Sequence, residues 1–246
     1  MIPAVERRSG IGRLTSEMGN DGSRKYGLVL LIVVANVLFV AISSGDDWSR
    51  LVGTALSGAT AIAAIRAAGA KAGPQRLVRL AVVAAIIGSG LVLATGGGSF
   101  ARGLIALANA GFIIFSPLVI IRGLLNHVLD EGVDAQVVAG ALAIYMMLGL
   151  FFAFVVASVS EFSSTPYFVQ HATVTASDEV YFSFITLSTV GYGDYTPALG
   201  IGRGMAILEG VSGQLYLVTV VALLIGNLRG RMRRPPAGKP PEEAEV

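Results

Sequence analysis

Six long apolar segments restrict what this chain can fold into more than any other feature of its sequence. They cover residues 26–44, 48–68, 77–95, 103–121, 133–160 and 199–228. A helix that crosses the hydrocarbon core of a bilayer needs about 20 predominantly apolar residues, and each segment is close to this length or longer. Only 14% of the residues are charged, against about a quarter in an ordinary soluble domain. The sequence therefore predicts an all-α membrane protein with six transmembrane helices per chain.

The distribution of positive charge predicts the direction in which these helices cross the membrane. With the N-terminus in the cytoplasm, 15 of the 18 Lys and Arg residues fall on the cytoplasmic side, and only Arg50, Arg102 and Arg203 fall outside. The positive-inside rule describes this asymmetry. We therefore expect a multi-pass protein of the plasma membrane with both termini in the cytoplasm, beginning with a cytoplasmic arm over residues 1–25.

A mixed segment, residues 161–197, separates the last two apolar segments. Its central string is Thr186-Leu187-Ser188-Thr189-Val190-Gly191-Tyr192-Gly193-Asp194. Gly191 and Gly193 lack a Cβ and so allow the unusual backbone angles at which successive carbonyl groups point to one side. Carbonyl oxygens arranged in this way can replace the water shell of a K⁺ ion, and the Thr189 hydroxyl adds a further oxygen. The predicted topology places this string on the outer side.

The string from Thr186 to Asp194, with the flanking run 195–197, resembles the signature of potassium channels, and the run 208–217 resembles the inner helix of bacterial two-helix pore modules. With six predicted spans, the chain resembles the six-transmembrane, voltage-gated-like superfamily, which has a re-entrant pore helix before its selectivity filter. The resemblance implies that the following residues form the filter: Thr189, Val190, Gly191, Tyr192 and Gly193. It places K⁺ at the first four of these. Because the string occurs once in the chain and a pore needs four, we expect a homotetramer.

A short pore helix is expected directly before the filter. Ser177 is predicted to cap its start, with Asp178 and Glu179 at the positive end of the helix dipole. The helix should run to about Ser188, so that its negative end favours a cation below the filter.

Several further residues are expected to support the filter. The aromatic side chains of Tyr181, Phe182 and Phe184 form either a collar that holds the filter open or ordinary core packing. The resemblance implies that Asp194 ties the filter down at its outer mouth, and Ile185 stands where some family members have a glutamate. The complete predicted support set is Thr186, Ser188, Asp194, Tyr181, Phe182 and Glu209.

The last apolar segment carries the remaining candidate sites. Glu209 is an ionisable residue within an apolar helix, which predicts either an anchor for the pore helix through hydrogen bonds or a proton-sensitive element. Gly210 and Gly213 are candidate gating hinges, with close helix packing as the alternative. The basic cluster that follows either anchors the topology or binds anionic lipid headgroups. It comprises Arg229, Arg231, Arg233 and Arg234.

The first four helices, residues 26–121, occupy the position of a voltage sensor. A working sensor needs roughly 3–4 gating charges per subunit, mainly arginines on its fourth helix. Residues 103–121 contain no charged residue, and Arg102 and Arg122 only flank them. We therefore expect a sensor-like domain without strong voltage dependence. An amphipathic connector over 122–132 should join it to a pore domain over 133–228, followed by a cytoplasmic tail over 229–246.

These features favour a potassium-selective channel that conducts K⁺ passively. The alternatives are a non-selective cation channel of the same architecture and a non-conducting membrane scaffold or regulatory subunit. We expect no enzymatic activity, no cofactor beyond the permeant K⁺ and no nucleic-acid partner. The chain has no cysteine and two histidines, which excludes thiolate and histidine-rich metal sites.

Overall fold

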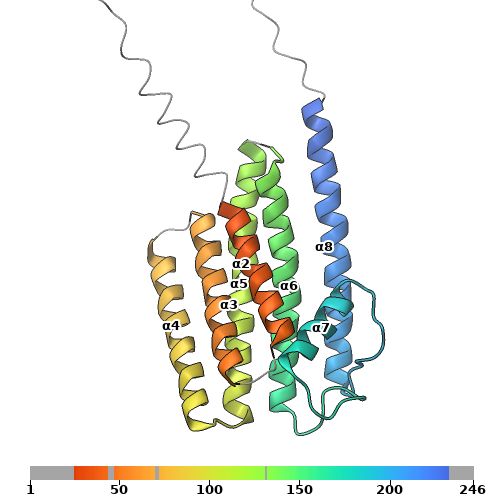
Figure 1. Cartoon of the computed structure of the whole chain (residues 1–246). Coiled ribbons are helices and arrows are strands. Elements are labelled where there is room, and N and C mark those ends of the chain that lie inside the picture. Colours follow the sequence, from red (N-terminus) through yellow and green to blue (C-terminus); the bar gives the residue numbers. More distant parts are fainter. Residues whose placement is uncertain (1–24, 44–46, 70–71, 131, 233–246) are drawn as a thin grey trace, which may run out of the picture.

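The computed structural model describes residues 25–43, 47–69, 72–130 and 132–232, and these form seven helices and no strand (Figure 1). The helices are α2 (Lys25–Ile42), α3 (Asp47–Ala67), α4 (Ala72–Thr95), α5 (Ser99–Asp130), α6 (Ala135–Phe162), α7 (Ala176–Leu187) and α8 (Gly200–Met232). The prediction of an all-α fold is confirmed for this part of the chain. Most of the N-terminal arm, together with Arg233 and Arg234, lies outside the described residues.

The six long helices lie side by side and alternate in direction along the chain (Figure 1). The start of α2 and the end of α8 therefore lie at one end of the molecule, and α7 lies near the opposite end. The Gln136 Oε1 atom accepts hydrogen bonds from the backbone N–H groups of Tyr26 (3.0 Å) and Gly27 (3.4 Å), which fixes the start of α2 beside the start of α6. We refer to the end that carries α7 as the filter end.

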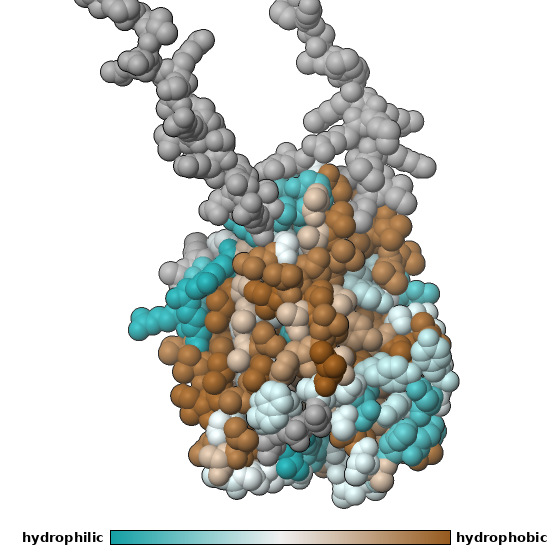
Figure 2. All heavy atoms as spheres, viewed as in Figure 1, coloured by the Kyte–Doolittle hydropathy of each residue, from teal (hydrophilic) through white to brown (hydrophobic). Residues whose placement is uncertain are grey.

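Within the described residues, five helices are long and apolar enough to cross a membrane. They are α2, α4 from Gln75, α5 up to Val128, α6, and α8 up to Leu223. Figure 2 shows a broad hydrophobic face along the helices, with hydrophilic residues gathered around the filter end. The chain is therefore a multi-pass membrane protein by the length and composition of its helices.

The second predicted span forms helix α3 but is not among these five, because its residues are less apolar. Its polar side chains face neighbouring helices. Asn36 Nδ2 of α2 donates to Ser57 Oγ of α3 at 3.2 Å, and Asn109 Nδ2 of α5 donates to Thr54 Oγ1 of α3 at 3.1 Å. Polar groups that pair between helices in this way are common within membranes. A sixth crossing by α3 stays a prediction.

The connector expected over residues 122–132 does not form a separate element. Residues 122–130 continue α5 without a break. The next helix begins after Asp134, whose Oδ1 accepts the N–H of Val137 at 2.9 Å and so caps α6. Extending a helix by one residue costs less free energy than ending it and nucleating a new one, which explains the length of α5.

Two buried hydrophobic clusters hold the pore helix α7 in place. The larger cluster combines residues of α2, α3, α5, α6 and α7, and Phe184 of α7 packs against it. In the smaller cluster, Phe182 of α7 packs edge-on against Tyr167 and Phe168 of the preceding loop, with ring centroids 6.4 and 5.0 Å apart. The helix is therefore fixed on both sides by its own chain.

Candidate functional site

Helix α7 begins with a capping box two residues before the predicted cap. Thr175 Oγ1 accepts the N–H of Asp178, and Asp178 Oδ2 accepts the N–H of Thr175 at 2.8 Å. The prediction that Ser177 caps the helix is wrong, because the Ser177 hydroxyl donates to the carbonyl of Ala41 in α2 instead. The Thr175–Asp178 spacing in the sequence was the signal for the correct cap.

The backbone amides that follow α7 turn back toward its C-terminal end. The N–H of Val190 and that of Gly191 both donate to the carbonyl of Ile185, at 2.9 and 3.1 Å. The N–H of Thr189 donates to the carbonyl of Thr186 at 3.0 Å. In a planar trans peptide the C=O points opposite to the N–H of the next residue. The carbonyl oxygens of Thr189 and Val190 therefore point away from the pore helix.

Residues 188–194, which follow α7 and belong to no β-sheet, are called the filter strand below. The backbone of this segment takes left-handed conformations at every second residue from Thr189 to Gly193. Thr189, Gly191 and Gly193 have φ values of 61°, 50° and 80°. Thr189 is the only non-glycine residue with positive φ in the described part of the chain, and such a conformation costs about 1–3 kcal/mol. Strain of this kind persists only where surrounding structure enforces it, and here the amide bonds to Ile185 and Thr186 do so.

The strand is exposed on the side away from α7. Residues 188–194 are all exposed, and the side chains of Val190 and Tyr192 are 53% and 72% exposed. The carbonyl oxygens of Thr189 and Val190 thus face a surface that no described part of this chain covers. One strand supplies oxygens from one side only, whereas a dehydrated cation needs them on all sides.

Two reciprocal tyrosine–carboxylate hydrogen bonds join α7 to the end of the strand. The Tyr181 hydroxyl donates to Asp194 Oδ2 at 2.7 Å, and the Tyr195 hydroxyl donates to Asp178 Oδ1 at 2.7 Å. The hydrogen bond to Asp178 raises the pKa of Tyr195 to about 12, so its hydroxyl stays a donor across the physiological range. Two residues of the predicted support set, Tyr181 and Asp194, are thus in contact, while their supporting role stays a prediction; the hydrogen bond of Tyr195 was missed.

A loop before α7 also holds the end of the strand. Gln170 Nε2 donates to the carbonyl of Gly193 at 3.3 Å and to Thr196 Oγ1 at 2.8 Å, while its Oε1 accepts the N–H of Thr196 at 2.9 Å. Phe168 forms an antiparallel bridge with Pro197. Sequence reasoning missed Gln170, because nothing in its local sequence indicates a partner more than twenty residues away.

The aromatic residues predicted to form a collar divide between two environments. Tyr181 is partly exposed and reaches the filter strand through Asp194. Phe182 is buried among the loop aromatics on the other side of α7. Within this chain, Phe182 therefore supports the filter only indirectly, by holding α7, as the core-packing alternative described.

Glu209 is buried on α8 behind the pore helix, with only 1% of its surface exposed. Its carboxyl faces Ser183 of α7 and the hydroxyl of Tyr167. In the described part of the chain, Glu209 Oε1, Ser183 Oγ and the Tyr167 hydroxyl have no hydrogen-bond partner. The location behind the pore helix agrees with the predicted support role, which itself stays a prediction.

The two candidate hinge glycines differ in their contacts with α7. A Cβ placed on Gly213 would lie 2.2 Å from the carbonyl oxygen of Leu187, whereas one on Gly210 would lie 3.6 Å from the carbonyl oxygen of Thr186. Only the second distance is an ordinary van der Waals contact. Gly213 therefore marks a close approach between α8 and the end of the pore helix, which favours the packing interpretation at this position.

The basic cluster after the last span is only partly described. Arg229 and Arg231 lie within the final turns of α8, and Arg233 and Arg234 lie outside the described residues. Binding of anionic headgroups by this cluster stays a prediction.

Tyr195→Phe is expected to loosen the attachment of residues 188–194 to α7. The variant removes the hydrogen bond to the Asp178 carboxylate, worth about 1.5–3 kcal/mol. The backbone amides of Val190 and Gly191 should therefore exchange their hydrogens faster than in the wild type. Tyr145→Phe removes a hydroxyl from α6 and is the matched control. Equal exchange rates in all three proteins would contradict a role for Tyr195.

Residues 141–229 match a family model described as "Ion channel". The match covers most of α6, all of α7, the exposed strand and most of α8, which is the part that holds the arrangement above. No curated protein and no solved structure matches the chain significantly. The membrane-spanning helices and this match together support an ion channel with the pore in its C-terminal half, and the family suggests a protein that is not an enzyme.

Proposed function

We propose that the chain is one subunit of a homotetrameric, K⁺-selective channel that conducts K⁺ passively. The observation that carries this proposal is the direction of the filter carbonyls. Those of Thr189 and Val190 point away from the pore helix, on a strand with left-handed backbone at Thr189, Gly191 and Gly193. Neutral carbonyl oxygens in rings are what a K⁺ ion needs in exchange for its water shell. The proposed K⁺ sites are Thr189, Val190, Gly191 and Tyr192, with Gly193 completing the filter.

The exposed surface next to the strand supports the assembly of four chains. Leu208, Val211, Leu215 and Val218 follow each other along one face of α8 and are each more than half exposed. We infer that neighbouring subunits cover this stripe and the exposed residues 188–194. Four copies around one axis then supply the oxygens that a single strand lacks.

We further propose that conduction depends little on voltage. Helix α5, in the place of a sensor helix, has Arg102 at its start and Arg122 beyond its middle. Arg102 is bound to Glu161 of the pore domain, with its Nε 3.1 Å from Glu161 Oε1. Between these two arginines, residues 103–121 carry no charge, so α5 lacks the roughly 3–4 gating charges that a voltage sensor needs. The cytoplasmic position of both termini and the plasma-membrane location belong to the same proposal.

Ion flux through purified protein in liposomes tests this function. The wild type should carry K⁺, with a reversal potential that follows the K⁺ gradient when Na⁺ is on the opposite side. Gly191→Asp should carry no more than protein-free liposomes, because an aspartate cannot adopt the backbone of Gly191 without strain. Equal flux in wild type and variant would refute a channel through this strand. A reversal potential near zero would favour the non-selective alternative, and no flux in either protein would favour a scaffold.

A further inference from the structure

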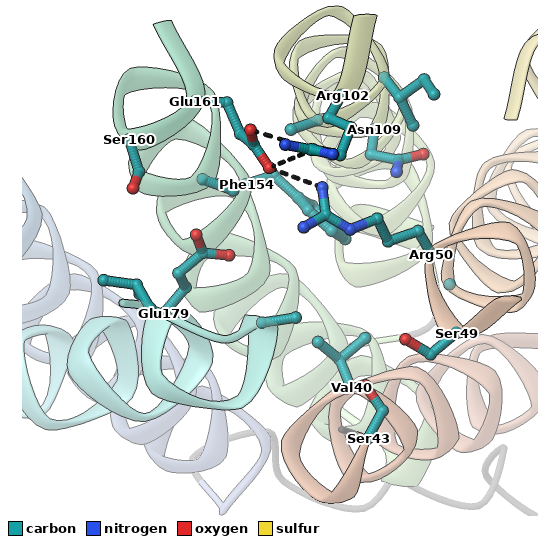
Figure 3. A pocket seen from close by; sticks show the side chains of 16 residues that line it. Val40, Ser43, Ser49, Arg50, Arg102, Asn109, Phe154, Ser160, Glu161 and Glu179 are labelled. Atoms are coloured by element: carbon teal, nitrogen blue, oxygen red, sulfur yellow. Dashed lines mark hydrogen bonds and ion pairs between the residues drawn. The ribbon is translucent and has the colours of Figure 1, made fainter. Parts of the chain in front are cut away.

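A small pocket with four charged side chains in its otherwise mostly apolar lining lies at the filter end, between helices α2, α3 and α5 and helices α6 and α7 (Figure 3). It has a volume of about 80 Å³, which is room for a few water molecules but for no larger ligand. Its charged lining comes from four helices, with Arg50 on α3, Arg102 on α5, Glu161 on α6 and Glu179 on α7. The proposed conduction mechanism makes no use of this pocket.

Three of these charges are joined by ion pairs. Arg50 Nη1 lies 2.7 Å from Glu161 Oε1, and Arg102 Nε lies 3.1 and 3.2 Å from the two Glu161 oxygens. All three side chains are at least two-thirds buried. The Glu161 carboxylate thus accepts hydrogen bonds from two guanidinium groups.

Glu179 faces this set from the first turn of the pore helix (Figure 3). Among the residues that the structure describes, its carboxyl has no hydrogen-bond or ion-pair partner. Burial and the negative charges of Glu161 and Asp178 favour the protonated form of Glu179, whereas the positive charge of Arg50 favours the ionised form. Burial dominates and raises the pKa of Glu179 to about 8.

The other titratable groups around Glu179 do not act as the proton-binding group of this pocket. Asp178, its neighbour on α7, is held by Thr175 and Tyr195 at the mouth. Tyr167 approaches from the loop before α7 and keeps its proton because burial raises its pKa further. Glu179 is therefore the group in this pocket whose charge can change in the physiological range.

We propose that Glu179 is a proton-binding site, accessible from the side predicted to be outside, that links external pH to conduction. When ionised, Glu179 competes with Glu161 for Arg50 and draws the start of α7 toward α3. When protonated, it releases Arg50 to Glu161. Asp178, the residue before Glu179, accepts the hydrogen bond from Tyr195 at the filter mouth. A movement of the first turn of α7 is therefore transmitted directly to the filter. The link to conduction rests on the proposed channel function, whereas the proton site itself does not.

The fluorescence of Trp48 tests the site without any ion flux. Trp48 is the single tryptophan of the chain, lies two residues from Arg50 and contacts Phe39 with ring centroids 6.1 Å apart. Between about pH 6 and 10, the wild type should show a titration of Trp48 emission that Glu179→Gln lacks. Glu179→Asp, which keeps a carboxyl, should retain a titration with a shifted midpoint. A titration unchanged in Glu179→Gln would overturn the proposal.

Two histidine variants exclude other sources of the signal. His171 stacks on Tyr195 near the mouth, and His127 lies beside Asp134 at the opposite end. The variants His171→Gln and His127→Gln should both keep the Trp48 titration. Its loss in either would assign the signal to that histidine and overturn the assignment to Glu179.

The same variants measured in liposomes test the link to conduction. Wild-type K⁺ flux should change about fivefold or more when external pH crosses the Trp48 midpoint, as expected for a coupled site, and flux through Glu179→Gln should stay constant. The link would be overturned if the wild-type flux did not respond to external pH. It would also be overturned if the flux through Glu179→Gln responded as strongly as the wild-type flux. If no protein conducts, the channel proposal fails, and the fluorescence result still decides whether Glu179 binds the proton.

Discussion

Gly213→Ala is expected to abolish K⁺ flux and to destabilise the assembled protein. The added methyl group would lie 2.2 Å from the carbonyl oxygen of Leu187, a backbone atom at the end of the pore helix. A backbone carbonyl cannot turn aside as a flexible side chain can, so α8 or the filter must shift. Overpacking of this kind costs about 1–3 kcal/mol or more per chain. Thermal melting in detergent, native mass and liposome flux measure the effect.

Gly210→Ala is the matched control, because its methyl group meets the Thr186 carbonyl at 3.6 Å, an ordinary contact distance. This variant should assemble and conduct like the wild type. The pair also separates the two interpretations of Gly213. A packing role predicts loss of stability, whereas a hinge role predicts a stable tetramer that fails to open. A stable and fully conducting Gly213→Ala protein would contradict both.

Glu161→Gln is expected to have the second largest effect, on the junction between the four-helix part and the pore domain. The variant removes the charged acceptor of both Arg50 and Arg102, which are two-thirds buried. Removing one partner of a charged hydrogen bond costs about 1.5–3 kcal/mol, so the midpoint of thermal unfolding should fall clearly.

A double-mutant cycle with Arg102→Gln isolates the pairing from other effects of the substitution. If Glu161 and Arg102 interact as their 3.1 Å contact indicates, the double variant should lose less free energy of unfolding than the two single variants lose together. Strictly additive losses would show that the ion pair contributes nothing to stability.

The long helices could be predicted closely because their apolar composition is a local property. The predicted fifth span, 133–160, and the helix Ala135–Phe162 differ by two residues at each end. The unusual backbone at Gly191 and Gly193 could also be predicted, since residues without a Cβ permit the left-handed angles found there. Both glycines lie within residues 141–229, which are similar to an ion channel family.

The contacts that hold the site in place could not be predicted in the same way. Gln170 reaches Gly193, and Glu161 binds Arg50 more than one hundred residues away. Such partners depend on how helices pack, which hydrophobic periodicity alone does not encode. The moderate polarity of α3 is likewise explained only by the packed structure. Thr54 accepts a hydrogen bond from Asn109 of α5, and Ser57 accepts one from Asn36 of α2.

Because α5 continues without a break to Asp130, the connection between α5 and α6 is very short. Only residues 131–134 separate α5 from α6, and the two form the most extensive helix pair in the described part of the chain. So short a connection makes α6 turn back along α5 of its own chain. The packing between the four-helix part and the helix that follows it is therefore made within a single chain and needs no second copy.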